Sequence, residues 1–597
     1  MPDRRACLTA RLRRAGFCAA AAALGSCSPQ QSPPAPEPSR FQPEWEMRAR
    51  ARPLIAARAA VASNSRLASE AGVEMLRLGG NAVDAAVATG FALSVTHPEA
   101  GSLGGGGFMV ITMQPDTAAS ADSRYETTAL DFRETAPAAA TRDMFSRSRD
   151  GRWSSTVGYG AVAVPGLVAG LTSALDRHGS LPLATVIAPA IRLAEDGFVV
   201  DSLLALSIRQ YRARLEQFAG GDLLVPGGRP LGIGDTLRQP ALARTLRRIA
   251  TGGAAAFYRG PTAAEIADDV RRGGGLLDAA DMAGYQAVWR EPVSVRYRGY
   301  TMTGAPLPSS GLLTAGEALM ILEALGPPAP FGTARSLHAT ASALQRAFID
   351  RARLGDPGTT AAAAVAAMQD RGRAARLAGS IDFGRATPTP EITRAASREE
   401  LETTHWSVVD ARGNAVAATT TINDIFGSGA FVSASGIFLS DTMDDFAAAP
   451  GRADQWGLIS GEANAIAGGK RPLSSMTPFI LLDPEGRLVL VAGSRGGPRI
   501  ISNVLQLVTG VVDHGMSVTD AISAPRVHHQ GSPDNLRYEV GGFHAAVIDS
   551  LRTMGYTLAP YRPDTLPYMG RAVAIGRAQR GWEAIVDPRF GELSAGY

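Results

Sequence analysis

The stretch from Thr403 to Thr421 predicts a β-hairpin, and the rest of the chain has to be arranged around it. Its first arm, Thr403–Asp410, reads Thr-Thr-His-Trp-Ser-Val-Val-Asp, and its second arm, Ala415–Thr421, consists of Ala, Val and Thr. A polar turn, Ala411-Arg412-Gly413-Asn414, separates the arms. β-Branched and aromatic residues on both sides of a Gly-containing turn are typical of paired strands. Taken alone, the leading threonine needs no explanation beyond its preference for strands.

The net charge of +3 comes from the N-terminus of the chain. Residues 1–26 contain five Arg and one Asp, so the remaining residues carry about −1 in total. A body without excess positive charge argues against nucleic acid as a partner. Lys470 is the only lysine of the chain, which favours a specific structural use for it.

Residues 1–26 predict a signal peptide of the lipoprotein type. Arginines precede an apolar run, Ala15–Leu24, that is too short to span a bilayer. The run continues into Gly25-Ser26-Cys27, which resembles a bacterial lipoprotein cleavage box with Cys27 as the lipidated residue. An ordinary secretory signal with an incidental cysteine is the alternative. We therefore expect a periplasmic or cell-envelope protein that touches the membrane only through a lipid anchor, with the Pro-rich residues 27–50 as a flexible tether.

The folded body is expected to begin near Ala51 and to contain neither a disulfide nor a metal site. All three cysteines, Cys7, Cys18 and Cys27, precede it, which excludes a disulfide and a thiolate metal site. The adjacent His528 and His529 would point apart on a strand, so they do not form a chelating pair. We expect no metal and no cofactor.

Two helices are expected at the start of this body. Leu67–Leu78 has helical apolar spacing, and Asn81–Val95 is apolar nearly all round, which predicts a buried helix. Further on, Pro189 and Pro240 predict helix starts.

The glycine-rich stretch His97–Ile111 invites comparison with a phosphate-binding loop. Its glycines lead into a strand pattern rather than a helix, and no Gly-Lys-Ser/Thr follows. Close packing of the backbone is the better explanation for these glycines.

Further motifs accompany the hairpin. They are Asp131-Phe132-Arg133-Glu134-Thr135-Ala136-Pro137, Ser440-Asp441-Thr442-Met443-Asp444-Asp445-Phe446, Lys470-Arg471-Pro472-Leu473-Ser474-Ser475-Met476-Thr477-Pro478 and Gly493-Ser494-Arg495-Gly496-Gly497-Pro498-Arg499-Ile500. Together with Thr403–Ala417 they resemble the γ-glutamyltransferases, also called γ-glutamyl transpeptidases or glutathione hydrolases. The resemblance runs from about Ala56 to Tyr597.

The resemblance implies a fold and a maturation step. The fold class is α/β: a four-layer α/β/β/α sandwich with two central antiparallel sheets, the N-terminal-nucleophile hydrolase arrangement. One precursor cuts itself between Glu402 and Thr403. The products are a large subunit, residues 51–402, and a small catalytic subunit, residues 403–597, which interweave as a heterodimer.

The resemblance also assigns site residues. Thr403 is the nucleophile, Thr421 hydrogen-bonds its hydroxyl, and the N–H groups of Gly496 and Gly497 face the oxyanion. The residues assigned to the γ-glutamyl donor are Arg133, Ser474 and Ser475 for its α-carboxylate, Asp445 with Thr442 for its α-ammonium, and Asn423 for its amino-acid end. Residues 447–464 have the length of the family's lid, with Trp456 at the position of its aromatic residue.

The chemistry needs a nucleophile, a base and an oxyanion site. Freed Thr403 supplies a hydroxyl and an α-amine, whose unperturbed pKa of about 7.7–8.0 allows it to act as a base near neutral pH. The expected reaction transfers the γ-glutamyl group of glutathione and related amides, through an ester on Thr403, to water or to amino acids and dipeptides.

One position departs from the family pattern. The residue three before Asp445 is usually Gln or Glu, and here it is the shorter Thr442. Losing a hydrogen bond to the donor's ammonium predicts a raised KM rather than a new substrate class. Two alternatives remain open: a glutaryl-cephalosporin-type acylase on the same fold, and a catalytically silent surface lipoprotein.

Overall fold

The computed structural model describes residues 41–115, 125–146, 153–389, 403–563, 569–589 and 595–597. The predicted signal peptide, Cys27 and Glu402 lie outside these residues.

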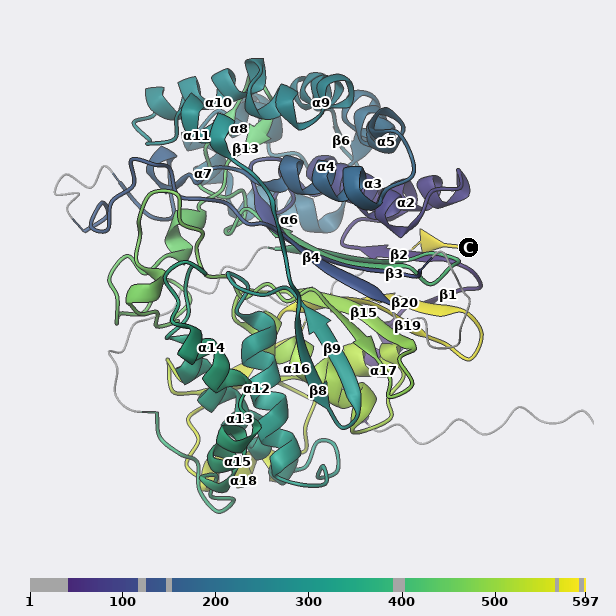
Figure 1. The fold of residues 1–597 in the computed structure, drawn as a ribbon, viewed down its shortest axis with the longest axis vertical. Coiled ribbons are helices and arrows are strands. Elements are labelled where there is room, and N and C mark those ends of the chain that lie inside the picture. Colours follow the sequence, from purple (N-terminus) through teal and green to yellow (C-terminus); the bar gives the residue numbers. More distant parts are fainter. Residues whose placement is uncertain (1–40, 116–124, 147–152, 390–402, 564–568, 590–594) are drawn as a thin grey trace, which may run out of the picture. The chain divides into compact units, whose positions relative to one another are not determined.

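Two seven-stranded sheets form the centre of the described body (Figure 1). The first has the order β21 (Ala595–Gly596), β2 (Ala60–Ser63), β10 (Thr404–Val409), β11 (Ala415–Thr421), β3 (Gly106–Met113), β4 (Glu126–Phe132), β7 (Val288–Arg290). The second has the order β1 (Leu54–Ala56), β20 (Trp582–Val586), β19 (Arg571–Arg577), β15 (Leu488–Arg495), β14 (Phe479–Leu482), β9 (Tyr300–Gly304), β8 (Val293–Tyr297). Every neighbouring pair in both sheets is antiparallel.

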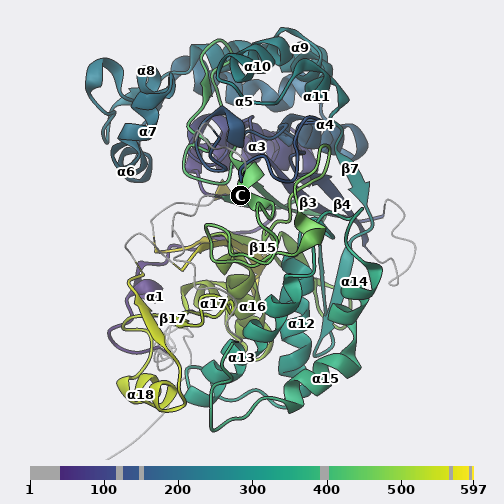
Figure 2. The same ribbon diagram turned by 90° about the vertical axis from the view of Figure 1, so that its left-hand side faces the viewer.

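Helices cover the outer face of each sheet, so the layers run helix, sheet, sheet, helix (Figures 1 and 2). On the side of the first sheet lie α2 (Arg66–Arg77), α3 (Ala82–Thr96), α4 (Leu167–His178), α5 (Leu183–Asp196), α6 (Ser202–Gln210), α7 (Arg212–Gln217), α8 (Gly220–Leu224), α9 (Pro240–Tyr258), α10 (Pro261–Arg272) and α11 (Ala279–Gly284). On the side of the second lie α12 (Gly311–Ala324), α13 (Ala334–Arg351), α14 (Ala362–Gln369), α15 (Arg371–Gly379), α16 (Arg499–Val512), α17 (Val518–Ser523) and α18 (Ala545–Thr553). The predicted four-layer α/β/β/α class is confirmed.

Smaller elements complete the body. They are α1 (Met47–Arg50), the pair β5 (Phe198–Val199) and β6 (Thr236–Leu237), the pair β12 (Phe431–Val432) and β13 (Ile437–Phe438), and the sheet of β16 (Val527–His528), β17 (Leu536–Glu539) and β18 (Leu558–Tyr561). Within the described residues no helix has the length and apolar character needed to cross a membrane.

Each sheet mixes strands from both sides of the predicted cut at Thr403. In the first sheet, β10 and β11 lie between β2 and β3, which come from residues before the cut. In the second, β14, β15, β19 and β20 come from residues after the cut and pair with β1 and β9. Neither sheet can form from one segment alone.

The hairpin and the two early helices form as predicted. β10 and β11 pair antiparallel and are buried throughout. Asn81 caps α3 because its side chain accepts N–H groups of Val83 and Asp84, and every residue of this helix is buried.

The glycines before and at the start of β3 serve backbone packing, as predicted. A Cβ on Gly105 would lie 2.2 Å from the Thr421 carbonyl oxygen, and one on Gly107 would lie 2.0 Å from that of Thr419. Strand β11, which carries Thr421, can therefore approach this loop only because the loop has no side chains there.

Two local predictions are wrong. Pro240 does begin α9, but Pro189 lies inside α5, which starts at Leu183. A proline in a helix interior deprives one carbonyl of its donor, and the packing of α5 against α3 and α9 keeps the helix continuous. The body also begins at Phe41, not near Ala51, because Phe41, Trp45 and Met47 are buried, and the Trp45 indole donates to the Ser523 carbonyl at 2.6 Å.

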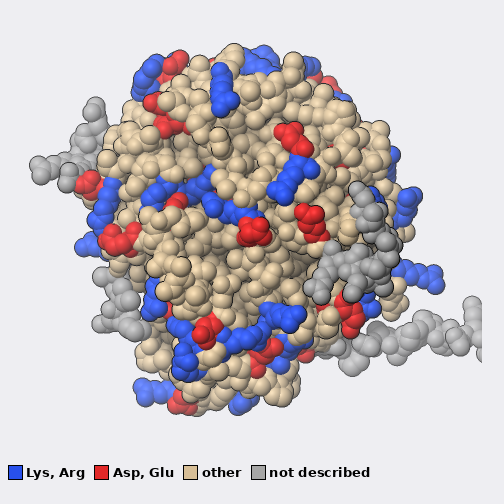
Figure 3. All heavy atoms as spheres, viewed as in Figure 1, with Lys and Arg blue, Asp and Glu red and all other residues tan. Residues whose placement is uncertain are grey.

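Charged side chains on the face in Figure 3 are mixed in sign. Lys and Arg lie interspersed with Asp and Glu over both helical layers, without a continuous basic stripe on this face.

Candidate active site

The register of the hairpin brings Thr403 and Thr421 together. Thr404 pairs with Thr420, so the residues one step further, Thr403 and Thr421, lie opposite each other. The Thr403 hydroxyl donates to the Thr421 hydroxyl at 3.4 Å, and Thr421 Oγ1 also accepts the Asn423 N–H at 2.9 Å. Both threonines are buried. Strand pairing alone therefore places a hydroxyl partner beside the predicted nucleophile.

A cavity opens beside these threonines. It is lined by Arg351, Thr403, Thr421, Asn423, Asp445, Asp454, Trp456, Leu458, Ser460, Leu473, Ser474, Ser475, Met476, Gly497, Pro498 and Ile500. Most of the predicted site residues therefore share one cavity. Arg133, Thr442 and Gly496 do not line it.

Arg133 lies behind the cavity wall, fully buried between two carboxylates. Its guanidinium pairs with Glu134 at 3.0 Å and with Asp445, whose side chain reaches the cavity. Burial raises the pKa of Glu134 to about 7, although Arg133 acts in the opposite direction. Burial also leaves the pKa of Asp445 above its usual value, again against Arg133. In this structure Arg133 orients Asp445 and does not itself face the cavity.

The two serines before β14 are held in place by their surroundings. The Ser474 hydroxyl accepts the Met476 N–H at 3.1 Å, and the Ser475 hydroxyl accepts a hydrogen bond from Arg351 at 3.1 Å. Arg351 ends α13 and also donates to the Ser310 hydroxyl at 2.9 Å. Burial lowers the pKa of Arg351 to about 10, so this residue still carries its charge at neutral pH.

Gly496 and Gly497 form the turn between β15 and α16. Their φ angles of 129° and 53° lie in the region that favours glycine. A Cβ on Gly496 would lie 2.8 Å from the Gly570 Cα. The turn places Gly497 on the cavity wall just before the N-terminus of α16, where the positive end of the helix dipole favours negative charge.

Asn423 and Thr442 contribute differently. Asn423 lines the cavity at φ 75°, and its amide donates to the side chain of Asp441 at 3.2 Å. Thr442 is fully buried, and its hydroxyl lies 3.0 Å from the Ser440 hydroxyl. The structure therefore directs the Thr442 oxygen to a neighbouring serine.

The lid segment, residues 447–464, is fastened at its end by the only lysine of the chain. Lys470 Nζ donates to the carbonyls of Ala463 and Ala465 at 3.0 and 2.7 Å. Trp456 lines the cavity, and its carbonyl accepts the Gln530 amide at 2.8 Å. Lys470 thus has a specific structural contact, as expected for the only lysine of the chain.

Arg351 and Asp454 line the cavity but were not predicted. Arg351 is an arginine in the last turn of a helix, which the helix dipole explains equally well, and Asp454 sits in a polar loop. Arg351 comes close to Ser475 through long-range packing, whereas Asp454 lies two residues before Trp456 in the lid segment and accepts its N–H at 2.8 Å. Neither residue type is marked as a site residue by its local sequence.

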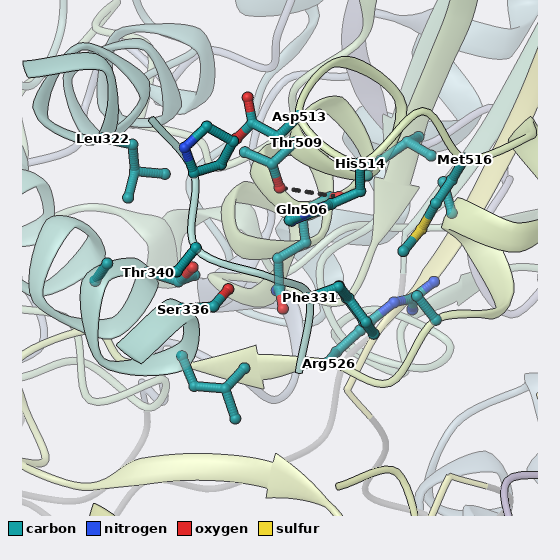
Figure 4. A pocket seen from close by; sticks show the side chains of 18 of the residues that line it. Leu322, Phe331, Ser336, Thr340, Gln506, Thr509, Asp513, His514, Met516 and Arg526 are labelled. Atoms are coloured by element: carbon teal, nitrogen blue, oxygen red, sulfur yellow. Dashed lines mark hydrogen bonds between the residues drawn. The ribbon is translucent and has the colours of Figure 1, made fainter. Parts of the chain in front are cut away.

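A larger cavity lies elsewhere, between the start of α13 and α16–α17 (Figure 4). Phe331, His514 and Met516 are among its lining residues, and the Thr509 hydroxyl donates to the Gln506 carbonyl there at 3.2 Å. Neither Thr403 nor any predicted donor-binding residue is among the residues that line it. Size therefore does not identify the active site of this protein.

Within the described part of the chain, no group of three or more His, Cys, Asp or Glu side chains could hold a metal ion. Glu402 and Cys27, predicted for cleavage and lipidation, lie outside the described residues.

Comparison with known proteins agrees with the geometry. The sequence profile of the family described as Gamma-glutamyltranspeptidase matches residues 68–597. The glutathione hydrolase proenzyme of Escherichia coli (strain K12) is 41% identical over 594 residues, covering 98% of this chain and 96% of that protein. The acylase ACY 1 proenzyme of Pseudomonas sp. (strain V22) is 38% identical over 494 residues, covering 80% of this chain and 84% of that protein. The crystal structure of a cephalosporin acylase from Bacillus halodurans superposes with a TM-score of 0.80 at 26% identity, covering 95% of this chain and 98% of that chain.

Proposed function

This chain belongs to the gamma-glutamyltranspeptidase family, and from that premise we propose that it is a γ-glutamyltransferase and glutathione hydrolase. It transfers the γ-glutamyl group of glutathione and related γ-glutamyl amides to water, amino acids or dipeptides. The observation that carries the proposal is the Thr403 hydroxyl, 3.4 Å from that of Thr421, at a cavity that also contains Asp445 and Gly497.

Maturation precedes catalysis. The Thr403 hydroxyl attacks the carbonyl carbon of Glu402, the peptide C–N bond breaks, and the Glu402 acyl group moves to the Thr403 oxygen as an ester. Water then hydrolyses the ester, which leaves a carboxylate on Glu402 and free hydroxyl and α-amino groups on Thr403.

Catalysis repeats the same attack on a substrate. The α-amine of Thr403 takes the proton from its hydroxyl, whose oxygen attacks the γ-carbonyl of the donor, while N–H groups of the Gly496–Gly497 turn stabilise the oxyanion. The leaving amine takes the proton, and a γ-glutamyl ester remains on Thr403. Water or the amino group of an acceptor then releases the γ-glutamyl group.

The lining chemistry supports an amino-acid donor. The Ser474 and Ser475 hydroxyls can donate to an α-carboxylate, and Arg351 adds positive charge beside Ser475. Asp445 presents a carboxylate on the same cavity and complements an α-ammonium. Asn423 can serve either group through its amide.

The first test is a pair of variants. Wild-type enzyme should resolve into two polypeptides on a denaturing gel and hydrolyse a chromogenic γ-glutamyl anilide, whereas Thr403→Ala should stay one band and be inactive. Thr404→Val is the matched control, because the Thr404 hydroxyl contacts Asn64 and lies outside the cavity lining. A wild-type protein that remains one inactive band rules out the proposal.

The acylase alternative is tested with the same assay. A glutaryl anilide keeps the reacting carbonyl and lacks the α-ammonium, so it should react more slowly than the γ-glutamyl anilide. Faster turnover of the glutaryl compound would assign the chain to acylase chemistry, and no turnover of either would favour a silent surface protein.

We also propose that the enzyme is periplasmic or in the cell envelope and is anchored through a lipid on Cys27. Cys27→Ser should release active enzyme from the membrane fraction, because the anchor is the acyl chains alone. Mass spectrometry of the mature N-terminus decides the point, since an unmodified N-terminus beyond Cys27 means ordinary secretion.

A further inference from the structure

Three buried side chains lie in a row directly behind the Gly496–Gly497 turn. Arg495 is the last residue of β15, and Gly496 follows it. Arg495 Nη1 lies 2.9 Å from His97 Nε2, and His97 Nδ1 lies 3.1 Å from Glu99 Oε1. Arg495 is 0%, His97 3% and Glu99 1% exposed. None of the three lines the cavity, so substrate does not explain them.

The chemistry of the three groups fixes which nitrogen of His97 carries the proton. A guanidinium only donates, so His97 Nε2 accepts from Arg495. The proton of the neutral imidazole is then on Nδ1 and points to Glu99. Burial raises the pKa of Glu99, but His97 and Arg495 outweigh it and hold that pKa below its usual value. The chain therefore consists of a cation, a neutral imidazole and a carboxylate.

The carboxylate is needed because the buried positive charge is large. Arg571 lies opposite Arg495 in the β15–β19 register and is also fully buried. Two guanidinium groups inside the protein are costly unless negative charge lies near them. Glu99 supplies such a charge to Arg495 through the His97 ring.

The His97–Glu99 turn also contacts the loop after β11, which carries Asn423. The Glu99 carbonyl accepts the Phe426 N–H at 2.9 Å, and Phe426 follows Asn423 in the loop after β11. The His97–Glu99 turn therefore contacts the segments that carry Gly496 and Asn423.

Gly496 and Gly497 have no side chains that could hold their own backbone. On the C-terminal side the Arg499 N–H donates to the Gly496 carbonyl at 3.1 Å. On the N-terminal side the Ser494 hydroxyl donates to the Arg495 carbonyl at 3.0 Å, and the Arg495 side chain adds a second fastening through His97. We propose that the Glu99–His97–Arg495 chain is a positioning device that aims the N–H groups of the Gly496–Gly497 turn at the oxyanion formed on the donor carbonyl.

The inference rests on the proposed function and predicts a specific kinetic effect. Loss of one oxyanion donor costs on the order of 10²–10³ in rate, so misaiming the turn should lower kcat by about 10- to 100-fold. KM for the γ-glutamyl anilide should change by no more than about twofold, because the donor is bound by other residues.

The test compares His97→Leu, Glu99→Gln and His97→Gln in the full-length enzyme. His97→Leu and Glu99→Gln interrupt the contacts between Glu99, His97 and Arg495. Glutamine at position 97 offers an acceptor to Arg495 and a donor to Glu99, so His97→Gln should restore part of kcat. Arg298→Met is the matched control, because it removes an arginine that pairs with Asp513 at 2.7 Å, and both residues line the cavity of Figure 4, away from Thr403. Its melting temperature should fall while kcat per folded enzyme stays at the wild-type value.

The outcomes separate the two claims. If wild-type enzyme does not turn over the anilide, the proposed function fails. If wild type is active and Glu99→Gln and His97→Leu keep wild-type kcat, or lose no more activity per folded enzyme than Arg298→Met, the positioning role is wrong. A rise in KM with unchanged kcat also overturns it, because that pattern indicates a role in donor binding.

Discussion

Three acidic groups around Asp445 are the clearest electrostatic feature of the site, and two of them, Asp445 and Asp454, line the cavity. Burial raises the pKa of Asp444 to about 7, leaves that of Asp445 above its usual value, and raises that of Asp454 well above its usual value. Each carboxylate lacks the hydration that would stabilise its charge. A bound ammonium would supply that stabilisation and lower these pKa values.

Glutamate binding should therefore release protons near pH 7. Titration calorimetry of the mature enzyme in two buffers of different ionisation enthalpy measures the number released. Glutarate has the same carboxylates without the ammonium, so it should release fewer protons. Equal release by both ligands, or net uptake with glutamate alone, would contradict an ammonium site at Asp445.

Thr442 can be tested by making it longer or by removing its hydroxyl. Thr442→Gln should lower KM for glutathione by roughly 10-fold, because a hydrogen bond to a charged group contributes about 1.5–3 kcal/mol. It should do little for glutaryl amides. Thr442→Val should leave KM unchanged, since the present hydroxyl bonds Ser440 rather than the cavity. An unchanged KM in the Gln variant would show that position 442 does not reach the donor.

At the scale of elements, the two sheets pack closely where His405 of β10 meets Gly493 of β15. A Cβ on Gly493 would lie 2.4 Å from His405 Cε1 and Nδ1. The ring is held by Thr419 at 2.7 Å and Ser407 at 3.1 Å, so it cannot move aside without losing both contacts.

Gly493→Ala should accordingly destabilise the protein by about 1–3 kcal/mol, the usual cost of overpacking a core. The change is measured as a lower urea midpoint of the precursor variant Thr403→Ala, which keeps the chain uncut. Gly413→Ala serves for comparison at a turn, where φ is 85° and no atom lies within 3.4 Å of the new Cβ. If Gly493→Ala lowers the stability no more than Gly413→Ala does, the two sheets separate easily at this contact.

The elements differ in how far the sequence could predict them. The hairpin and α3 follow from local patterns, because alternating β-branched residues and an Asn cap act over a few positions. The interior proline of α5 misled, because Pro189 predicts a helix start, whereas tertiary packing keeps the helix continuous from Leu183. Resemblance gave Thr403, Thr421 and Asp445, whereas Arg351 enters the cavity only through the packing of α13 against the Ser474–Ser475 loop. Arg133 is buried away from the cavity because it pairs with two carboxylates, and matching a motif does not reveal such pairing.

Over the whole molecule, buried neutral histidines link stability to pH. Burial lowers the pKa of His405 to about 3 and that of His528 well below its usual value. Below about pH 6.5 the unfolded chain binds protons at these positions and the folded chain does not. The contribution of His405 is intact above pH 6.5 and is lost as the pH falls toward 3, at about 1.4 kcal/mol per pH unit, and His528 acts in the same direction.

His405→Gln should weaken this dependence. The difference in unfolding free energy between pH 7.5 and pH 5 should shrink by about 2 kcal/mol, whatever the variant's absolute stability. Urea denaturation at the two pH values measures it, and the exposed His544→Gln should leave the difference unchanged. A dependence in His405→Gln as steep as in wild type would show that His405 takes up a proton in the folded protein.

The mixed strand order of the two sheets also makes maturation a one-way process. While the chain is continuous, β10 finds its place between β2 and β11 as part of one molecule. After the proposed cut, unfolded halves would have to find each other in solution and interleave strands in both sheets at once. Self-cleavage therefore removes the covalent link between the two segments, which made folding efficient. We therefore expect unfolded mature enzyme to refold far less well than the uncut precursor.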